Sequence, residues 1–307
     1  MVIRRPFFLL LLFIQFQPVF CQNTVKQLVE DGITKARLGD FKEALTSFDK
    51  AVAIDSTTSE PYYNRGLVYS QLNDWPAAIR DFSKVILLRP SYPDPYFNRA
   101  LAKDYLKDRR GAIEDYSMAI TLKPDFPDAF LNRGLDIYEL GDYQEAADDF
   151  SRAIQFKPGF AEAYYNRGLS RFGLKDYPAA IADFNQAITL DTLSVDYFAS
   201  RGAAKAASGL YDDAVLDFNI VIRANPADMN ALSNRALASM YLKNWQEAAD
   251  DYSKIIENDP SNQDALTSRG VARQYLKDMA GACSDWKTAS DLGSVKASQY
   301  FQKYCDK

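Results

Sequence analysis

Acidic doublets are the residues of this chain whose types and spacing come nearest to a catalytic or metal-binding arrangement. Asp148–Asp149 and Asp250–Asp251 offer paired carboxylates, which can bind a cation or carry a proton. Both doublets fall in segments that we expect to be helical, where neighbouring side chains point in different directions. Neither is followed by the turn glycine of a calcium loop. We therefore interpret them as ordinary helix residues.

The composition removes most other kinds of catalytic site. The 307 residues include no histidine, so histidine-activated nucleophiles and histidine metal ligands are excluded, and three cysteines cannot form a tetrahedral zinc site on their own. There is no glycine-rich phosphate loop. The sequence predicts no catalytic residues, no metal and no cofactor, and hence no enzyme. A net charge of -5 argues against non-specific nucleic-acid binding.

The N-terminus has the pattern of an export signal. Arg4 and Arg5 precede an apolar run over residues 7–20 that is too short and interrupted for a good membrane span. We predict a signal peptide over residues 1–21, and a periplasmic or extracellular protein. A lipid anchor at Cys21 and an uncleaved anchor remain alternatives, and membrane contact is expected only if the segment is retained.

The rest of the chain is a repeat. From Val25, a pattern of 34 residues recurs eight times without a gap. The repeats are 25–58, 59–92, 93–126, 127–160, 161–194, 195–228, 229–262 and 263–296. In each repeat, position 8 is Gly or Ala, position 20 is Ala and position 24 is aromatic; the fifth repeat has Gly168, Ala180 and Phe184. Small residues at positions 8 and 20 let two helices cross closely, and the aromatic side chain fills the space beside them.

Helix signals complete this picture. Aspartate often precedes the second helix of a repeat, and proline at position 32 ends that helix in five repeats. The pattern resembles the tetratricopeptide-repeat (TPR) family. The resemblance implies one all-α solenoid over residues 22–307, with eight helical hairpins in a right-handed superhelix. An amphipathic segment at about 295–306 is predicted to be a capping helix.

Charged residues at two repeat positions depart from the family pattern. Seven repeats have arginine at position 7, where an apolar residue is common, and the same seven have aspartate at position 23. A basic stripe for anionic ligands is one interpretation. We favour structural pairing inside each repeat, because positions 7 and 23 lie level in a hairpin that turns near position 15, and because the first repeat lacks both residues.

The family resemblance places partner binding on the concave face, which the first helix of each repeat forms. The candidate binding residues, which are apolar or aromatic, are Tyr63, Leu67, Phe97, Leu101, Leu131, Leu135, Tyr138, Tyr165, Leu169 and Phe172. Packing between adjacent first helices is the alternative interpretation of the aromatic ones. The expected ligand is a protein or peptide segment with apolar anchors and some basic residues, with no dedicated small-molecule substrate and no nucleic acid. The expected function is a non-catalytic scaffold, and a self-associating envelope subunit is the alternative.

Two cysteines are predicted to form a disulfide. If the chain turns near Gly293 and Ser294, then Cys283 and Cys305 lie level on adjacent helices. An exported protein folds in an oxidising compartment, which favours the bond. Two unpaired buried thiols are the alternative.

Overall fold

The computed structural model describes residues 17–306, and the chain divides into two compact units, Met1–Leu140 and Gly141–Lys307. Within the described residues the secondary structure is helical, with no strand. Residues 1–16 of the predicted signal peptide lie outside the described range, so the signal stays a prediction. In the described part of the chain, no helix is both long and apolar enough to cross a membrane.

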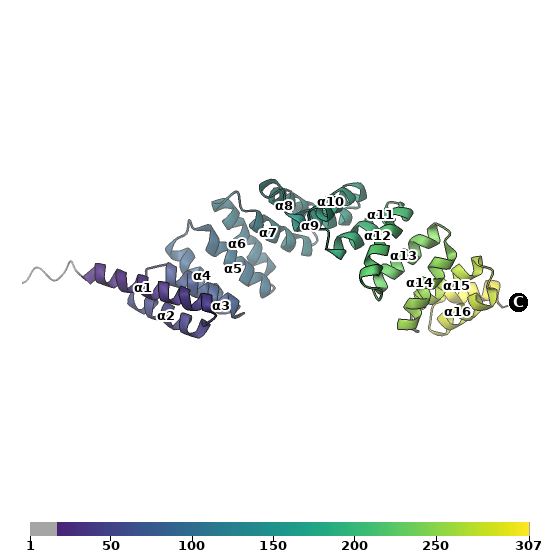
Figure 1. Ribbon diagram of the computed structural model, residues 1–307, viewed down its shortest axis with the longest axis horizontal. Coiled ribbons are helices and arrows are strands. Elements are labelled where there is room, and N and C mark those ends of the chain that lie inside the picture. The colour runs from purple at the N-terminus through teal and green to yellow at the C-terminus, as the bar shows by residue number, and fades with distance from the viewer. Residues whose placement is uncertain (1–16, 307) are drawn as a thin grey trace, which may run out of the picture. The chain divides into compact units, whose positions relative to one another are not determined.

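The first unit consists of three antiparallel hairpins followed by a single helix (Figure 1). Its helices are α1 (Gln17–Leu38), α2 (Phe41–Ile54), α3 (Glu60–Gln71), α4 (Trp75–Leu88), α5 (Pro93–Tyr105), α6 (Arg109–Leu122) and α7 (Pro127–Glu139).

The second unit begins with one helix, continues with four hairpins and ends in a shorter helix. Its helices are α8 (Tyr143–Phe156), α9 (Ala161–Gly173), α10 (Tyr177–Leu190), α11 (Val195–Ala207), α12 (Tyr211–Ala224), α13 (Met229–Tyr241), α14 (Trp245–Asn258), α15 (Gln263–Tyr275), α16 (Met279–Asp291) and α17 (Val295–Tyr304). The helix order confirms an all-α helical-repeat solenoid. The final helix α17 packs on α16 and covers the ring of Trp286, as expected of a cap.

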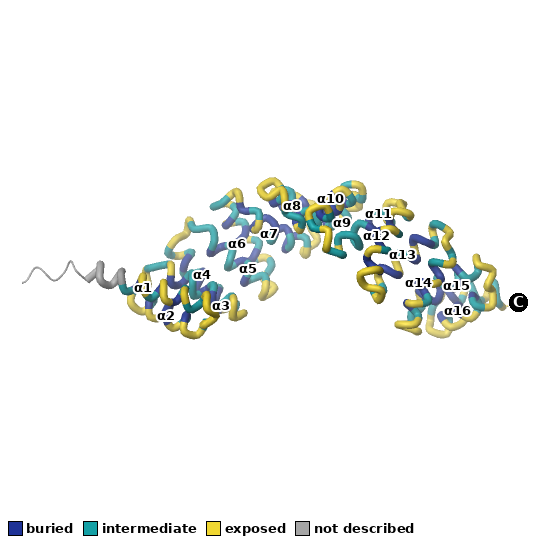
Figure 2. The backbone as a smooth tube through the Cα atoms, viewed as in Figure 1, coloured by how far each residue is buried: buried dark blue, intermediate teal, exposed yellow. Residues whose placement is uncertain are grey.

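The core of each repeat lies where its two helices cross. A methyl group added at Gly168 would lie 2.7 Å from the ring of Phe184, so glycine is needed at position 8 to admit the aromatic side chain. Ala180 and Phe184 are fully buried. Figure 2 shows that the buried residues lie within the helices and that many exposed residues lie at the turns.

The turns inside the hairpins share one backbone conformation. The residue at position 15 has a positive φ in every repeat, from 59° at Asn73 to 88° at Gly141. Gly293, in the turn before α17, also has a positive φ, of 106°. A residue in the left-handed conformation directly after a helix reverses the chain direction. It also lets the last carbonyl groups of that helix accept hydrogen bonds from the turn. The second helix then starts with a side-chain cap in several repeats, as at Asp74 and Asp176, whereas Asp40 lies at the same position of the first repeat and makes no such bond.

The position-7 arginines pair with the position-23 aspartates of the same repeat, as predicted. In the fifth repeat, Arg167 donates Nε and Nη2 to the two carboxylate oxygens of Asp183 at 2.9 and 2.7 Å. The same two-pronged geometry occurs in five more pairs, which are Arg65–Asp81, Arg99–Asp115, Arg201–Asp217, Arg235–Asp251 and Arg269–Asp285. The seventh pair, Arg133 and Asp149, falls on opposite sides of the boundary between the units. We call the six described pairs the Arg–Asp ladder.

Each ladder arginine also bonds to the preceding repeat. Arg167 Nη1 donates to Ser151 Oγ at 3.1 Å, and Arg65 Nη1 donates to Asp49 Oδ1 at 2.6 Å. The acceptor always lies 16 residues before the arginine, just as the aspartate lies 16 residues after it. The guanidinium group therefore joins the two helices of one hairpin to the hairpin before it, which the sequence analysis did not foresee.

The two ends of the repeat array lack this bridge. The first repeat has Asp31 in place of the arginine, and Asp31 accepts hydrogen bonds from Ser47 Oγ and from Lys35 Nζ. The last repeat has Lys287 at the acceptor position, where no further arginine follows, and Lys287 pairs with Asp291 at 3.4 Å. The exceptions to the pattern thus fall where there is no neighbouring repeat to join.

We expect the ladder to contribute strongly to stability. Asp183 is 2% exposed, so Arg167→Ala leaves a buried carboxylate with only Arg171 as a cationic partner and should cost about 3 kcal/mol, as should Asp183→Ala. Chemical denaturation of the two variants measures this. Glu30→Ala is the control, because the Lys26–Glu30 pair is exposed and contributes about 0–1 kcal/mol. Changes below about half a kcal/mol in both ladder variants would show instead that these pairs are solvated.

Candidate partner-binding surface

The candidate binding residues all lie on first helices, but they belong to two units. Those on α3, α5 and α7 of the first unit are Tyr63, Leu67, Phe97, Leu101, Leu131, Leu135 and Tyr138. Tyr165, Leu169 and Phe172 lie on α9 of the second unit. Leu131 is only 4% exposed, so little of it is open to a partner, while the others are partly buried.

The aromatic residues at position 5 pack between repeats. The Tyr63 ring lies 6.0 Å from that of Phe82 in its own repeat, and its hydroxyl accepts a hydrogen bond at 3.1 Å from Asn98 of the next repeat. Tyr165 contacts the next repeat twice, with its ring 4.7 Å from that of Tyr197 and its hydroxyl 3.3 Å from Ser200 Oγ. These contacts favour the interpretation that position-5 aromatics hold adjacent repeats together.

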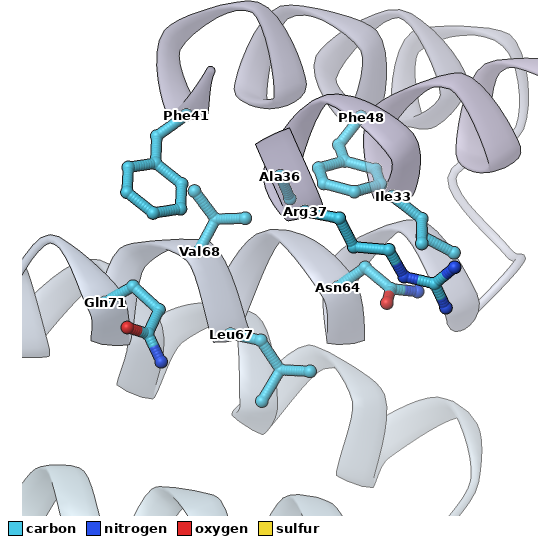
Figure 3. Close-up of a pocket in the computed structure, with 9 residues that line it drawn as sticks. All are labelled: Ile33, Ala36, Arg37, Phe41, Phe48, Asn64, Leu67, Val68 and Gln71. Atoms are coloured by element: carbon cyan, nitrogen blue, oxygen red, sulfur yellow. The ribbon is translucent and has the colours of Figure 1, made fainter. Parts of the chain in front are cut away.

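A pocket of about 300 Å³ opens in the first unit between α1, α2 and α3 (Figure 3). It is lined by Ile33, Ala36, Arg37, Phe41, Phe48, Asn64, Leu67, Val68 and Gln71. Figure 3 shows the polar ends of Arg37 and Asn64 on one side and Phe41 and Gln71 on the other. Leu67 is the candidate binding residue that this pocket contains.

A larger hollow of about 420 Å³ lies in the second unit, and we call it the alanine hollow. It is lined by Phe172, Ala203, Ala206, Ala207, Tyr211, Asn234, Leu237, Ala238 and Tyr241. The alanines of α11 are too short to fill the space between α9 and α13. The rings of Tyr211 and Tyr241 stack 4.5 Å apart and contribute to its wall. The small size of the alanine side chains is what creates the hollow.

A second hollow of about 370 Å³ adjoins the first across α13. Both are lined by Leu237, whose side chain is 51% exposed. The second hollow is more polar, with Asn230, Ser233 and the exposed Asp264 among its lining residues. A segment crossing α13 could therefore place an apolar side chain in the alanine hollow and a polar one beyond it.

A polar cluster that sequence reasoning missed lies between the third and fourth repeats. Asp136 of α7 is 4% exposed, and its carboxyl lies beside that of Asp104 on α5. Burial, followed by the charge of Asp104, raises the pKa of Asp136 to about 7. Position 10 is small or apolar in most other repeats, as at Ala102 and Ala204, so an acid there was the available signal.

The acidic doublets have no metal-binding arrangement in the structure. Asp251 is buried in the ladder with Arg235, while Asp250 accepts a hydrogen bond from Gln246 on the helix surface. Over the described residues, no group of three or more acidic or cysteine side chains is placed to hold a metal ion.

Family models match five segments of the chain. A model described as "TPR repeat" matches residues 35–73 and 136–175. Two models described as "Tetratricopeptide repeat" match residues 59–92 and 161–191, and residues 200–263. No curated protein matches.

Solved structures of repeat proteins resemble the chain in fold. A TPR protein from Parabacteroides merdae is 20% identical, with 80% of this chain and 97% of that one covered and a TM-score of 0.57. The C-terminal part of a TPR protein from Cytophaga hutchinsonii is 17% identical, with 78% and 98% covered and a TM-score of 0.64. YrrB, described as a TPR protein with an unusual peptide-binding site, is 20% identical, with 60% and 95% covered and a TM-score of 0.56.

The buried acid predicts a pH-dependent stability. Because the pKa of Asp136 is higher in the folded than in the unfolded chain, the protonated form favours folding, and stability falls as the pH rises from about 4 to about 7. Asp136→Asn keeps the shape of the protonated acid and should be more stable than the wild type at pH 8. Thermal melts from about pH 5 to about pH 8 test this. If both proteins show the same pH profile, Asp136 is ionised throughout.

Proposed function

Because the chain belongs to the tetratricopeptide-repeat family, we propose that it is a non-catalytic scaffold that binds a segment of a protein partner. The fold supports this, since the Arg–Asp ladder and the inter-repeat contacts give a rigid frame on which side chains of the first helices are held open. YrrB, which has a similar fold, is described as having a peptide-binding site. The partner itself is to be found by experiment.

The alanine hollow is the single observation that carries this proposal. It is concave and mainly apolar, and its volume of about 420 Å³ is in the range of pockets that receive ligand groups. Leu237 and Tyr241 at its edge are 51% and 60% exposed, which leaves apolar surface to be covered. A bulky apolar side chain of the partner would fill the space that Ala203 and Ala206 leave empty.

We also propose that the protein acts outside the cytoplasm. The basic residues and apolar run of the N-terminal segment support export with cleavage before Gln22. The positions of the cysteines agree with an oxidising compartment, since the Cα atoms of Cys283 and Cys305 lie 5.7 Å apart, within the usual range for a disulfide.

Replacing Leu237 should weaken partner binding. Leu237→Ser removes an exposed apolar side chain between the two hollows, so we expect roughly tenfold weaker binding, equivalent to about 1.4 kcal/mol. Affinity purification with mass spectrometry identifies the partner, and calorimetry then gives the affinity. Leu216→Ser is the matched control, because Leu216 is 61% exposed on the second helix α12. Equal affinity of both variants and the wild type would place binding elsewhere.

The exported protein should carry the Cys283–Cys305 bond. We expect the intact mass of the denatured, unreduced protein to correspond to a chain that begins at Gln22 and lacks two hydrogens. The bond closes a loop of 22 residues and should stabilise the folded chain by about 3 kcal/mol. Alkylation of both thiols before reduction would disprove the bond, and a retained or lipid-modified N-terminus would appear in the same mass.

A further inference from the structure

We propose that a basic side chain of the partner, an arginine or a lysine, binds at the carboxyl pair formed by Asp104 and Asp136. This inference rests on the proposed function, to which it adds a chemical requirement for the partner. It concerns the first unit alone.

Three helices of the first unit bring the groups together. Asp104 comes from α5, Arg109 and Tyr116 from α6, and Asp136 and Glu139 from α7. Arg109 is held by Glu139, with Nη2 3.2 Å from the carboxylate, and its Nε lies 3.9 Å from Asp136 Oδ1, too far for a hydrogen bond. The guanidinium group is therefore oriented toward Glu139 and leaves Asp136 without a close cationic donor.

Three buried polar atoms in this cluster have no hydrogen-bond partner among the described residues. They are Arg109 Nε, Asp136 Oδ2 and the Tyr116 hydroxyl, and Asp136 and Tyr116 are only 4% and 1% exposed. Burial, followed by the nearby charges of Asp136 and Asp104, raises the pKa of the Tyr116 hydroxyl. Buried polar groups are nearly always satisfied in folded proteins. The open acceptor Asp136 Oδ2, which Arg109 Nε does not reach, therefore indicates a donor that a ligand supplies, and the Tyr116 hydroxyl beside it can donate or accept.

The charges of the cluster select a cation. Asp104, Asp136 and Glu139 face one fixed cation, Arg109, and the nearby Lys103 is already paired with Asp115 at 2.7 Å. Two carboxyl groups and a phenol offer too few oxygen ligands for Ca²⁺, which takes six or more, and no metal-binding group occurs among the described residues. A guanidinium or ammonium group fits better, since it brings both the missing charge and the missing donors.

The surroundings suit the stem of a long basic side chain. Leu101 precedes Asp104 by three residues and so shares its face of α5. Asp104 and Leu101 are both partly exposed, so a partner can reach the pair from this side. The methylene groups of a lysine or arginine would cover Leu101 while the charged end reaches the carboxyl pair.

The free carboxyl pair retains a proton that a bound cation would displace. Asp136 is faced by Asp104 from α5, by Arg109 and Tyr116 from α6, and by Glu139 from its own helix. With its pKa near 7, Asp136 is largely protonated at pH 6 and largely ionised at pH 8. Binding of a basic side chain should therefore become tighter as the pH rises through this interval.

Selection from a random peptide library displayed on phage, with the whole exported chain as bait, tests the inference. We expect enriched peptides to contain arginine or lysine next to apolar residues. A synthetic copy of one such peptide should bind about tenfold tighter at pH 8 than at pH 6. Asp104→Asn should weaken it about tenfold, and Asp136→Asn should abolish the pH effect. Glu114→Gln, which removes an exposed charge from α6, should change neither, and circular dichroism checks that each variant folds.

The possible failures are distinct. Enriched peptides without basic residues, or binding that Asp104→Asn and Asp136→Asn leave unchanged, would overturn this inference and leave the scaffold proposal intact. A selection that enriches no peptide at all would count against the scaffold proposal, and with it against the basic-residue requirement.

Discussion

The guanidinium group at position 7 of the repeat is the interaction on which the rest of this structure depends. In Arg167, one edge of the group binds Asp183 of its own hairpin, and the remaining nitrogen binds Ser151 of the preceding hairpin. Arginine is suited to this because its planar fork offers donors in fixed directions, whereas a lysine offers one point charge. A buried carboxylate such as Asp183 is tolerated because three charged donors meet it, two from Arg167 and one from Arg171. The same side chain thus closes a hairpin and fixes the position of the next one.

Much of the fold could be predicted because the same residue types recur at the same positions of successive repeats. The spacing of Gly168, Ala180 and Phe184 predicts a helix crossing, and the joint occurrence of arginine and aspartate predicts their pairing. The bond from Arg167 back to Ser151 was missed, although position 25 is Ser, Asn or Asp in every repeat but the last. A small polar residue on a helix does not by itself indicate a contact, because such residues are common on protein surfaces. Its role becomes clear only when its hydrogen-bond partner is known.

The candidate site was less predictable because a binding surface depends on the space that side chains leave unfilled. Tyr63 and Tyr165 have the chemistry of binding anchors, yet their rings and hydroxyls are occupied by contacts with the next repeat. The alanine hollow arises at Ala203 and Ala206, where the sequence offers nothing that attracts a ligand by itself. A sequence reports which groups are present, whereas the space between them depends on helix positions that are set by packing elsewhere.

The junction between the third and fourth repeats shows how variation within a fixed frame can create a site. At three other junctions an aromatic ring on a second helix stacks on one from the next first helix, as Trp75 stacks on Tyr105 at 4.2 Å and Trp245 on Tyr275 at 4.1 Å. At this junction the equivalent residues are Arg109 and Glu139, which form an ion pair instead. A partly exposed ion pair stabilises less than stacked rings with their buried area, so the exchange gains little for the fold. Adding the buried Asp136 beside it costs further free energy, because an acid in a small-residue position must be desolvated. The third repeat nevertheless keeps its ladder pair, Arg99 and Asp115. A group of unfavourable polar residues at this one junction is therefore better explained by a ligand than by stability.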